Sequence, residues 1–423
     1  MALDWTQPAF LAGTVLILAR VAGELALERL NARHVEEHAT ELPEELRAAT
    51  DPGTHRRAVE YTLAKSRLAM AASWLEGVLL LAVLWSGLLP WLWSRTGTAA
   101  SGSVWGAAGF VLLVGAAFSA AGLPVSWYAQ FRLEERFGFN RTTQRTWWLD
   151  RFKGFLLSLA LLWPLLALIL KLVEWMGGTW WLWAWGVVLM VQVTVAALMP
   201  VVILPLFNNL RPLAAGPLRD RLLALADRTH FKIRDLLVMD GSRRSRHSNA
   251  FFAGLGRFRR IILFDTLIEQ LTGEELEAVL AHEIGHYRRR HVPKMLGAMA
   301  VGLLAGLGLL GWLAGQQPFY AAFGFADPHP AVAILLFGLL GGAVAFWLSP
   351  LMNWWSRRFE YEADEFAAKM MGSPDALVRA LRRLSGENLS NLTPHPWYSV
   401  FHHSHPTLLQ RERALIRGAA LPG

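Results

Sequence analysis

Long apolar stretches dominate this sequence and restrict the chain to folds that a lipid bilayer can stabilise. Seven of them reach about the twenty residues that a helix needs to cross the hydrocarbon core. They lie at 8–28, 69–93, 103–127, 154–174, 179–207, 294–316 and 329–353. Charged residues make up only 17% of the 423 residues, whereas soluble domains carry about a quarter. The sequence therefore predicts a multi-pass membrane protein with seven transmembrane helices.

The basic residues between these stretches indicate an orientation. Lys and Arg are concentrated in the segments 29–68, 128–153, 208–293 and 354–423. The alternate segments hold few, and 317–328 holds none. Because cytoplasmic loops carry the excess of basic residues, we expect the N-terminus outside and the C-terminus, with the long polar segments, in the cytoplasm.

The net charge of +8 and the absence of cysteine narrow the possible partners and ligands. Topology and anionic lipid headgroups explain the basic residues beside the spans, so we expect membrane lipids and no nucleic acid as partners. Without cysteine, disulfides, thiolate ligands and a Cys nucleophile are excluded. Any metal ion must be held by His, Asp or Glu.

The segment 208–293 is the largest soluble piece and has mixed character. A helix-like stretch at 216–230 precedes two short β-type runs, at 236–239 and 260–264. Thr272-Gly273-Glu274-Glu275 has the form of a capping box, so a helix should begin there. We divide the chain into an N-terminal region with five transmembrane helices, 1–207, and a metallopeptidase domain, 208–423, that includes the last two spans.

The segment His282-Glu283-Ile284-Gly285-His286 carries the strongest chemical signal. Residues four apart lie on one face of a helix, so His282 and His286 can bind a single zinc ion. Glu283 can then take the proton of a zinc-bound water that attacks a peptide carbonyl. The motif predicts a zinc metalloprotease with one Zn²⁺ per chain, and such a site needs a third protein ligand.

The third ligand is expected just after the seventh span. A metzincin histidine is excluded, because Arg289 and Val292 stand at the corresponding positions. Glu360 and Asp364 share a helix face, while Glu362 points roughly away from it. We expect Glu360 to bind zinc and Asp364 to accept a hydrogen bond from a ligand histidine.

Three other polar residues receive no catalytic role. His291 lies five residues past His286, on a different helix face, and is expected at the surface or an interface. Arg20 and Glu24 are one helical turn apart within the first span, where charge is costly. They form either an ion pair between helices or part of the lining of a watery cavity.

The sequence resembles the type I CAAX prenyl proteases, the integral-membrane zinc proteases that mature the yeast a-factor pheromone and prelamin A. The resemblance rests on HEIGH, on SRRFEYEADEFA after the last span, on HSHPTLLQR near the end, and on the stretches 134–143, 239–254 and 259–268. It implies a ring of seven long helices around a large water-filled chamber, with the zinc site at its cytoplasmic end.

The resemblance also implies roles for particular residues. Zinc would be bound by His282, His286 and Glu360, with Glu283 as the general base. Asn249 and Ala250 would lie on an edge strand that holds the substrate backbone by strand addition. His405 would come near the scissile bond, and Arg411 would support the site.

The fold class expected is therefore an all-α multi-pass membrane protein with a large interior chamber and a small α+β, gluzincin-like zinc-protease domain. The expected function is endopeptidase cleavage near the C-terminus of membrane-associated or prenylated, CAAX-type peptides. The alternatives are a membrane quality-control metalloprotease of the heat-shock type, and a non-catalytic seven-span transporter or receptor with a structural metal. The composition, rich in Ala, Leu, Arg and Trp, suits a bacterial inner-membrane protein.

Overall fold

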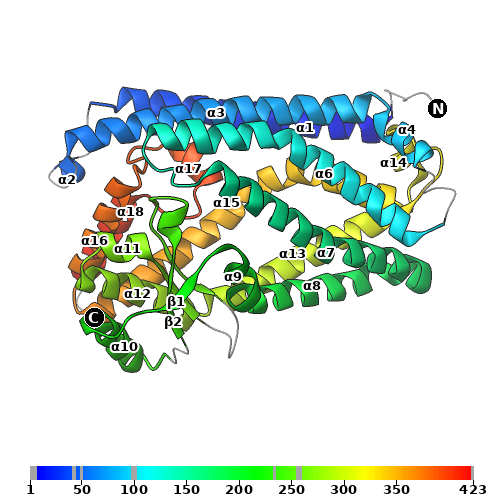
Figure 1. Ribbon diagram of the computed structural model, residues 1–423. Coiled ribbons are helices and arrows are strands. Elements are labelled where there is room, and N and C mark those ends of the chain that lie inside the picture. The colour runs from blue at the N-terminus through cyan, green and yellow to red at the C-terminus, as the bar shows by residue number, and fades with distance from the viewer. Residues whose placement is uncertain are drawn as a thin grey trace.

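Seven long helices build the larger part of the molecule (Figure 1). A computed structural model describes the chain except residues 1–6, 41–43, 48–50, 97–101, 232–234, 254–259 and 421–423. The long helices are α1 (Pro8–Glu37), α3 (Pro52–Trp85), α6 (Val104–Tyr128), α7 (Gln144–Met176), α8 (Trp180–Leu198), α13 (His291–Ala314) and α15 (Pro330–Met371). Shorter helical pieces join them: α2 (Glu44–Arg47), α4 (Leu88–Arg95), η1 (Ala129–Glu134), η2 (Gly177–Thr179), η3 (Met199–Ile203), α9 (Leu204–Phe207) and α14 (Gln317–Ala322).

The apolar stretches form helices long enough to cross a bilayer, but their count differs from the predicted seven. Within the described residues, six continuous helical segments have the required length and hydropathy. The fourth and fifth predicted spans share one of these, Gln144–Phe207. Gly177 has a φ of 51°, a conformation that glycine adopts readily, and at this point α8 folds back along α7 (Figure 1).

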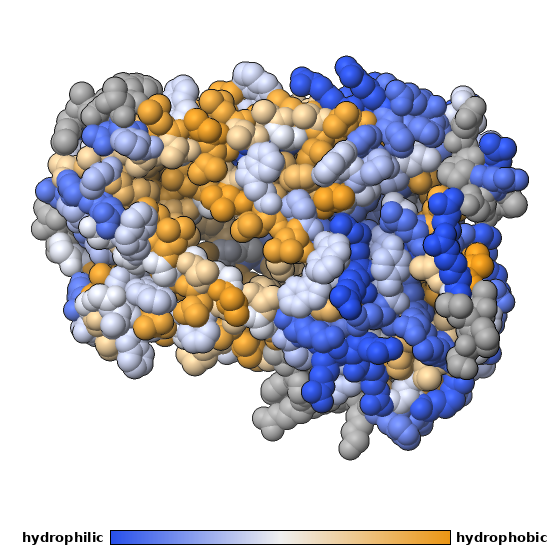
Figure 2. All heavy atoms as spheres, turned by 180° about the vertical axis from the view of Figure 1, so that it is seen from behind, coloured by the Kyte–Doolittle hydropathy of each residue, from blue (hydrophilic) through white to orange (hydrophobic). Residues whose placement is uncertain are grey.

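The outer faces of the long helices are apolar. Val15, Leu113, Trp183, Val301 and Leu351 are each more than half exposed, as expected for helices that face lipid. Figure 2 shows this apolar surface over one part of the molecule, hollowed between the helices, and a charged surface at the other end.

The charged end holds the small α+β unit. Its four-stranded sheet has the order β1-β2-β4-β3, with β2 and β4 parallel and the outer pairs antiparallel. The strands are β1 (Leu210–Pro212), β2 (Asp235–Met239), β3 (Ala250–Ala253) and β4 (Arg260–Phe264). The surrounding helices are α10 (Pro217–Arg228), η4 (Gly241–Arg243), α11 (Asp265–Gln270), α12 (Gly273–Arg288), α16 (Asp375–Glu387), α17 (Pro396–His402) and α18 (Leu408–Ala420).

The local predictions for this unit are confirmed. The helix-like stretch at 216–230 forms α10, and the two β-type runs form β2 and β4. A compact apolar core, which includes Leu222, Ile261 and Leu280, lies between the sheet and helices α10, α12 and α16. This core fixes α12 against the sheet.

Two stretches that are distant in the sequence join the helical region to the sheet. Asn140 forms an isolated bridge with Ser245, and the Phe139 ring stacks on His247 with centroids 4.1 Å apart. These residues belong to the stretches 134–143 and 239–254, on which the family resemblance partly rests. Gly254 of the second stretch and Arg259 of the third, 259–268, lie outside the described residues.

Arg20 and Glu24 form an ion pair that extends to α3. Arg20 Nε lies 2.8 Å from Glu24 Oε1, and a second nitrogen lies 3.1 Å from Glu76 on α3. The Ser73 hydroxyl donates to Glu24 over 2.6 Å. This network joins α1 to α3.

Candidate metal centre and active site

Helix α12 carries the HEIGH segment and begins at the predicted capping box. The Glu275 backbone N–H donates to the Thr272 hydroxyl over 3.3 Å, and the Thr272 N–H donates to the Glu275 carboxylate over 2.8 Å. Both bonds satisfy N–H groups that a helix start leaves unpaired. The cap fixes where α12 begins, and the four-residue spacing puts His282 and His286 on one face of it.

Helix α15 supplies the carboxylates, and a glycine lets it approach closely. A methyl group on Gly285 would lie 3.0 Å from the Cα of Ala363. Any side chain at position 285 would therefore push the two helices apart. At this crossing, Glu360 and Asp364 face α12 and are 4% and 2% exposed.

Three ligand side chains converge between the helices. The Nε2 atoms of His282 and His286 are 3.1 Å apart. Glu360 lies 3.5 Å from the first through Oε2 and 3.3 Å from the second through Oε1. Atoms bound to one tetrahedral zinc ion at about 2.0–2.2 Å are about 3.3–3.5 Å from one another. The spacing fits a single ion.

An oxygen without a hydrogen bond supports the same fit. Glu360 Oε2 is buried and has no hydrogen-bond partner among the described residues, and its nearest cationic neighbour, Arg411 Nη1, lies 3.6 Å away. Leaving a buried carboxylate oxygen without a hydrogen bond is costly, and a bound cation would remove that cost. His282, His286 and Glu360 thus form a donor set of two imidazoles and one carboxylate, as in catalytic zinc sites.

The orientation of His282 is fixed by Asp364 and Arg411. His282 Nδ1 lies 2.8 Å from Asp364 Oδ1, so its proton points to the carboxylate and its Nε2 lone pair points to the other ligands. The Arg411 guanidinium donates to both oxygens of Asp364, with Nε 2.8 Å from Oδ2. Arg411 Nη1 also lies 3.6 Å from Glu360.

His286 is oriented by His291, whose predicted place at the surface or an interface is wrong. His291 is only 1% exposed. Its Nε2 lies 3.1 Å from Glu362 Oε2, and its Nδ1 lies 2.9 Å from His286 Nδ1. Because the carboxylate only accepts, His291 Nε2 donates to it and Nδ1 accepts the proton of His286 Nδ1. The His286 Nε2 lone pair is thereby left for the metal site.

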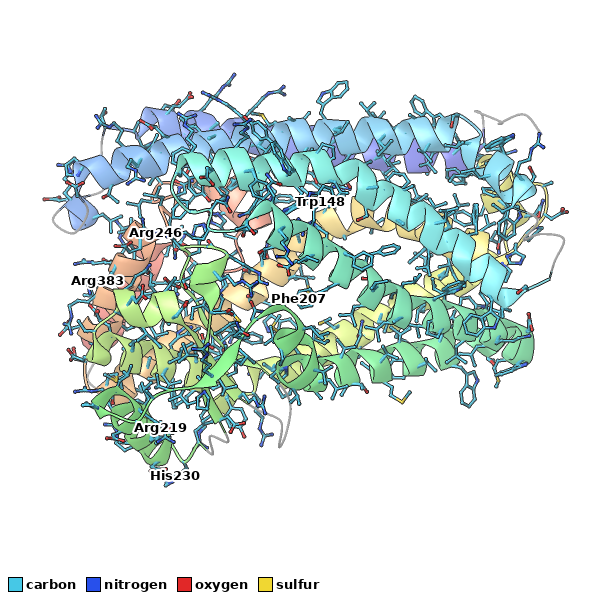
Figure 3. The ribbon with its side chains drawn as sticks, viewed as in Figure 1. Trp148, Phe207, Arg219, His230, Arg246 and Arg383 are labelled. Carbon is cyan, nitrogen blue, oxygen red and sulfur yellow. The ribbon has the colours of Figure 1, made fainter. Side chains whose placement is uncertain are left out.

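We expect His291→Ala to weaken metal binding about 10- to 100-fold, the usual effect of losing such an orienting partner. The Nδ1–H group of His286 would lose its acceptor, and the ring would be free to rotate. Competition with a chromophoric chelator measures the affinity. His230→Ala is the matched control, because His230 lies on the surface at the outer end of α10, away from the site (Figure 3). An unchanged affinity in the folded His291 variant would contradict this role.

Glu283 is on α12 and lies beside the three ligand side chains. Burial raises the pKa of its carboxyl, while His282 and His286 act in the opposite direction. Its side chain is half-buried. A carboxylate in this position can accept a proton from a water molecule held between the ligands and the substrate.

His405 and Arg411 connect the centre to a cavity of about 600 Å³. His405 Nε2 lies 3.4 Å from Glu360 Oε1, and the His405 side chain is 65% exposed. Tyr61, Lys65 and His402 line other parts of the cavity. His405 is therefore placed where it can reach both the centre and a molecule in the cavity.

Asn249 and Ala250 stand at the sheet edge next to α12. Strand β3 begins at Ala250 and pairs only with β4 among the described strands, so it is an edge strand. The Ala250 N–H donates to the Asn249 side-chain oxygen over 2.8 Å, and the Asn249 carbonyl accepts from the Phe264 N–H over 3.1 Å. No described strand pairs with the other edge of β3.

Comparisons with known proteins cover nearly the whole chain. A family model described as "CAAX prenyl protease N-terminal, five membrane helices" matches residues 31–209, and one described as "Peptidase family M48" matches residues 212–418. The "CAAX prenyl protease 1 homolog" of Oryza sativa subsp. japonica is 34% identical over 384 residues, which are 88% of this chain and 90% of the relative. The "CAAX prenyl protease 1" of Saccharomyces cerevisiae is 39% identical over 313 residues, which are 69% of this chain and 68% of the relative.

A solved structure shares the fold. The chain matches "Crystal Structure of S. mikatae Ste24p" with a TM-score of 0.90 at 33% sequence identity, over 97% of this chain and 99% of that one. These relatives come from a plant and from yeasts, so they do not support the bacterial origin that the composition suggested.

Proposed function

We propose that this chain uses a bound zinc ion to cut membrane-associated or prenylated peptides near their C-terminus. The chain belongs to the CAAX prenyl protease 1 family within peptidase family M48. Membership of the family makes the chain a multi-pass membrane metalloprotease. The expected helical fold with a peptidase domain is confirmed. The convergence of His282, His286 and Glu360 is the observation that carries the proposal.

His282, His286 and Glu360 would hold one ion per chain. Two imidazoles and a carboxylate suit zinc, and three protein ligands leave one position open. When bound, zinc polarises the scissile carbonyl and makes water more acidic. Asp364 and His291 hold the two imidazoles in the orientation that binding requires.

Glu283 would act as the general base. Its carboxylate accepts a proton from the attacking water and passes it to the leaving amine. His405, 3.4 Å from Glu360 and open to the cavity, would come near the scissile bond and would steady the substrate or the developing oxyanion. Arg411 would support the centre through its bonds to Asp364.

The substrate backbone would lie along β3. An extended peptide can add to a free strand edge through backbone hydrogen bonds. Asn249 and Ala250 lie at the N-terminal end of β3. Strand addition holds the peptide in an extended conformation whatever its side chains. This supports binding of varied peptide sequences.

The arrangement in the membrane follows from the basic segments. We place the N-terminus outside and the metal centre and C-terminus in the cytoplasm, and we keep 1–207 and 208–423 as the membrane region and the peptidase domain. A heat-shock type of quality-control protease remains the second candidate for the substrate class. The transporter or receptor alternative does not agree with the peptidase family.

Removal of the metal is expected to abolish cleavage. The purified full chain should hold zinc at His282, His286 and Glu360, lose activity on a prenylated peptide when a chelator removes the metal, and regain activity when zinc is returned. Elemental analysis and a peptide-cleavage assay measure the two quantities together. Activity that survives complete removal of metal would contradict the proposal.

The substrate class is tested separately. A farnesylated peptide, the same peptide without the lipid, and a misfolded membrane protein would be offered to the same preparation. We expect the farnesylated peptide to be cleaved with the highest kcat/KM. Preferred cleavage of the misfolded protein would instead favour quality control and would leave the zinc chemistry intact.

A further inference from the structure

A second cluster of metal-binding side chains lies at the end of α1. His34, Glu37 and His38 belong to the sequence HVEEH. Its His-x-x-Glu-His pattern reverses the His-Glu-x-x-His pattern of HEIGH at 282–286. The three residues share one helix face. One ligand atom from each lies within 4.8 Å of the others. Among the described residues, this group and the centre described above are the two that meet this condition.

The ring of His38 already has the orientation of a metal ligand. Its Nδ1 lies 2.8 Å from the carbonyl oxygen of His34. A carbonyl only accepts, so Nδ1 carries the proton and the neutral ring offers its Nε2 lone pair. His55 Nε2, from α3, lies 3.4 Å from the His38 carbonyl and fixes this residue further. The His34 and His38 rings are 4.2 Å apart.

The cluster stands against a loop that leads to the active site. Asn31 is 1% exposed, and its side-chain oxygen accepts from the backbone N–H of His395 over 3.1 Å and from the Asn391 amide over 3.4 Å. The His395 ring meets His34 edge-on at 5.4 Å. This loop continues through α17 to His405.

His395 is a neighbour of the cluster and not one of its ligands. Its Nδ1 accepts the Trp397 N–H over 3.2 Å at the start of α17. The proton of the neutral ring is therefore on Nε2, which leaves no lone pair for an ion. The donor set consists of His34, Glu37 and His38.

We propose that His34, Glu37 and His38 form a second site for a divalent ion of the zinc, nickel and copper class. Two imidazole nitrogens and one carboxylate favour these ions over magnesium or calcium, which prefer oxygen ligands. Three ligands from one helix leave the remaining positions to water, so the ion would exchange with the solution. Its binding would stabilise the end of α1 where it holds the 391–395 loop.

Metal stoichiometry tests the proposal. The full chain in detergent, stripped by chelator, is dialysed against buffered Zn²⁺ and analysed for bound metal. We expect two ions for the wild type and one for the double variant His34→Ala/His38→Ala. We also expect one ion for His282→Ala/His286→Ala and two for His230→Ala, the surface control.

The copper ion adds a spectroscopic test. In the His282→Ala/His286→Ala background, the paramagnetic resonance spectrum of bound Cu²⁺ should show coupling to imidazole nitrogen, and adding His34→Ala/His38→Ala should remove it. Equal stoichiometry in the wild type and the His34→Ala/His38→Ala variant would overturn the site. If the His34→Ala/His38→Ala variant still cleaves peptide with one bound ion, it is folded. Its loss of the second ion is then due to the two substitutions and not to unfolding.

Discussion

Glu283→Gln is expected to lower kcat about 100- to 10,000-fold, the range over which a general base contributes, while zinc stays bound at His282, His286 and Glu360. The amide keeps the size of the side chain but accepts no proton at neutral pH. The three ligand side chains are unchanged, and α12 keeps its cap. Peptide cleavage and elemental analysis of the same preparation separate the loss of chemistry from the loss of metal.

Glu274→Gln is the matched control on the same helix. Glu274 is exposed and pairs with Arg379 at the surface, where an ion pair contributes little to stability. Cleavage by this variant should equal that of the wild type. Wild-type cleavage by the Glu283 variant would assign the base to another group.

Glu360→Ala is expected to remove both the metal and the activity. Loss of an outer hydrogen-bond partner weakens metal binding about 10- to 100-fold, so loss of a direct ligand should exceed about 100-fold. Two imidazoles alone would remain between the helices, beside the positive charge of Arg411. Zinc content after dialysis at low free metal measures the effect.

Glu365→Ala tests whether this effect belongs to position 360. Glu365 lies on the same helix, is about half exposed and pairs with Lys369 at the surface. This variant should retain its zinc. The same test can be made in a chain that also carries His34→Ala/His38→Ala. If Glu360→Ala in that chain still left one tightly bound zinc ion, the third ligand would have to be another residue.

Much of the site could be predicted from local patterns. The capping box at Thr272 and the spacing of His282 and His286 are both properties of one helix, and neither depends on the rest of the chain. Glu360 and Asp364 required one further step, because they meet the histidines only when α15 packs on α12. The acidic helix face after the last span indicated that step and the family resemblance agreed with it, while Gly285 explains why the helices can come so close.

His291 shows where local reasoning failed. Five residues after His286 on a continuous helix, it would point to a different face. The structure ends α12 at Arg288 and begins α13 at His291. Arg290 adopts a φ of 56°, a left-handed conformation that reverses the chain. The turn brings His291 back against His286, and the sequence Arg288-Arg289-Arg290 contains no glycine or proline to indicate it.

The bounds of the predicted spans were inexact for a related reason. Hydropathy marks where a helix is apolar but not where it ends. The apolar stretch that ends at residue 93 crosses a turn at Gly87, whose φ is 72°. Two other stretches are joined through Gly177 into one helical segment. Single glycines decide these boundaries, and their effect depends on the packing around them.

The length of α15 has a consequence for the membrane around the protein. Its 42 residues run without interruption from the apolar region to Glu360 and beyond, which is about 63 Å at 1.5 Å per residue. Helices respond to a thinner or thicker bilayer by tilting. Because α15 also packs closely on α12 at Gly285, a tilt of α15 would be passed on to the helix that carries His282 and His286. The thickness of the lipid layer would then influence the position of the whole peptidase unit as well as that of the spanning helices.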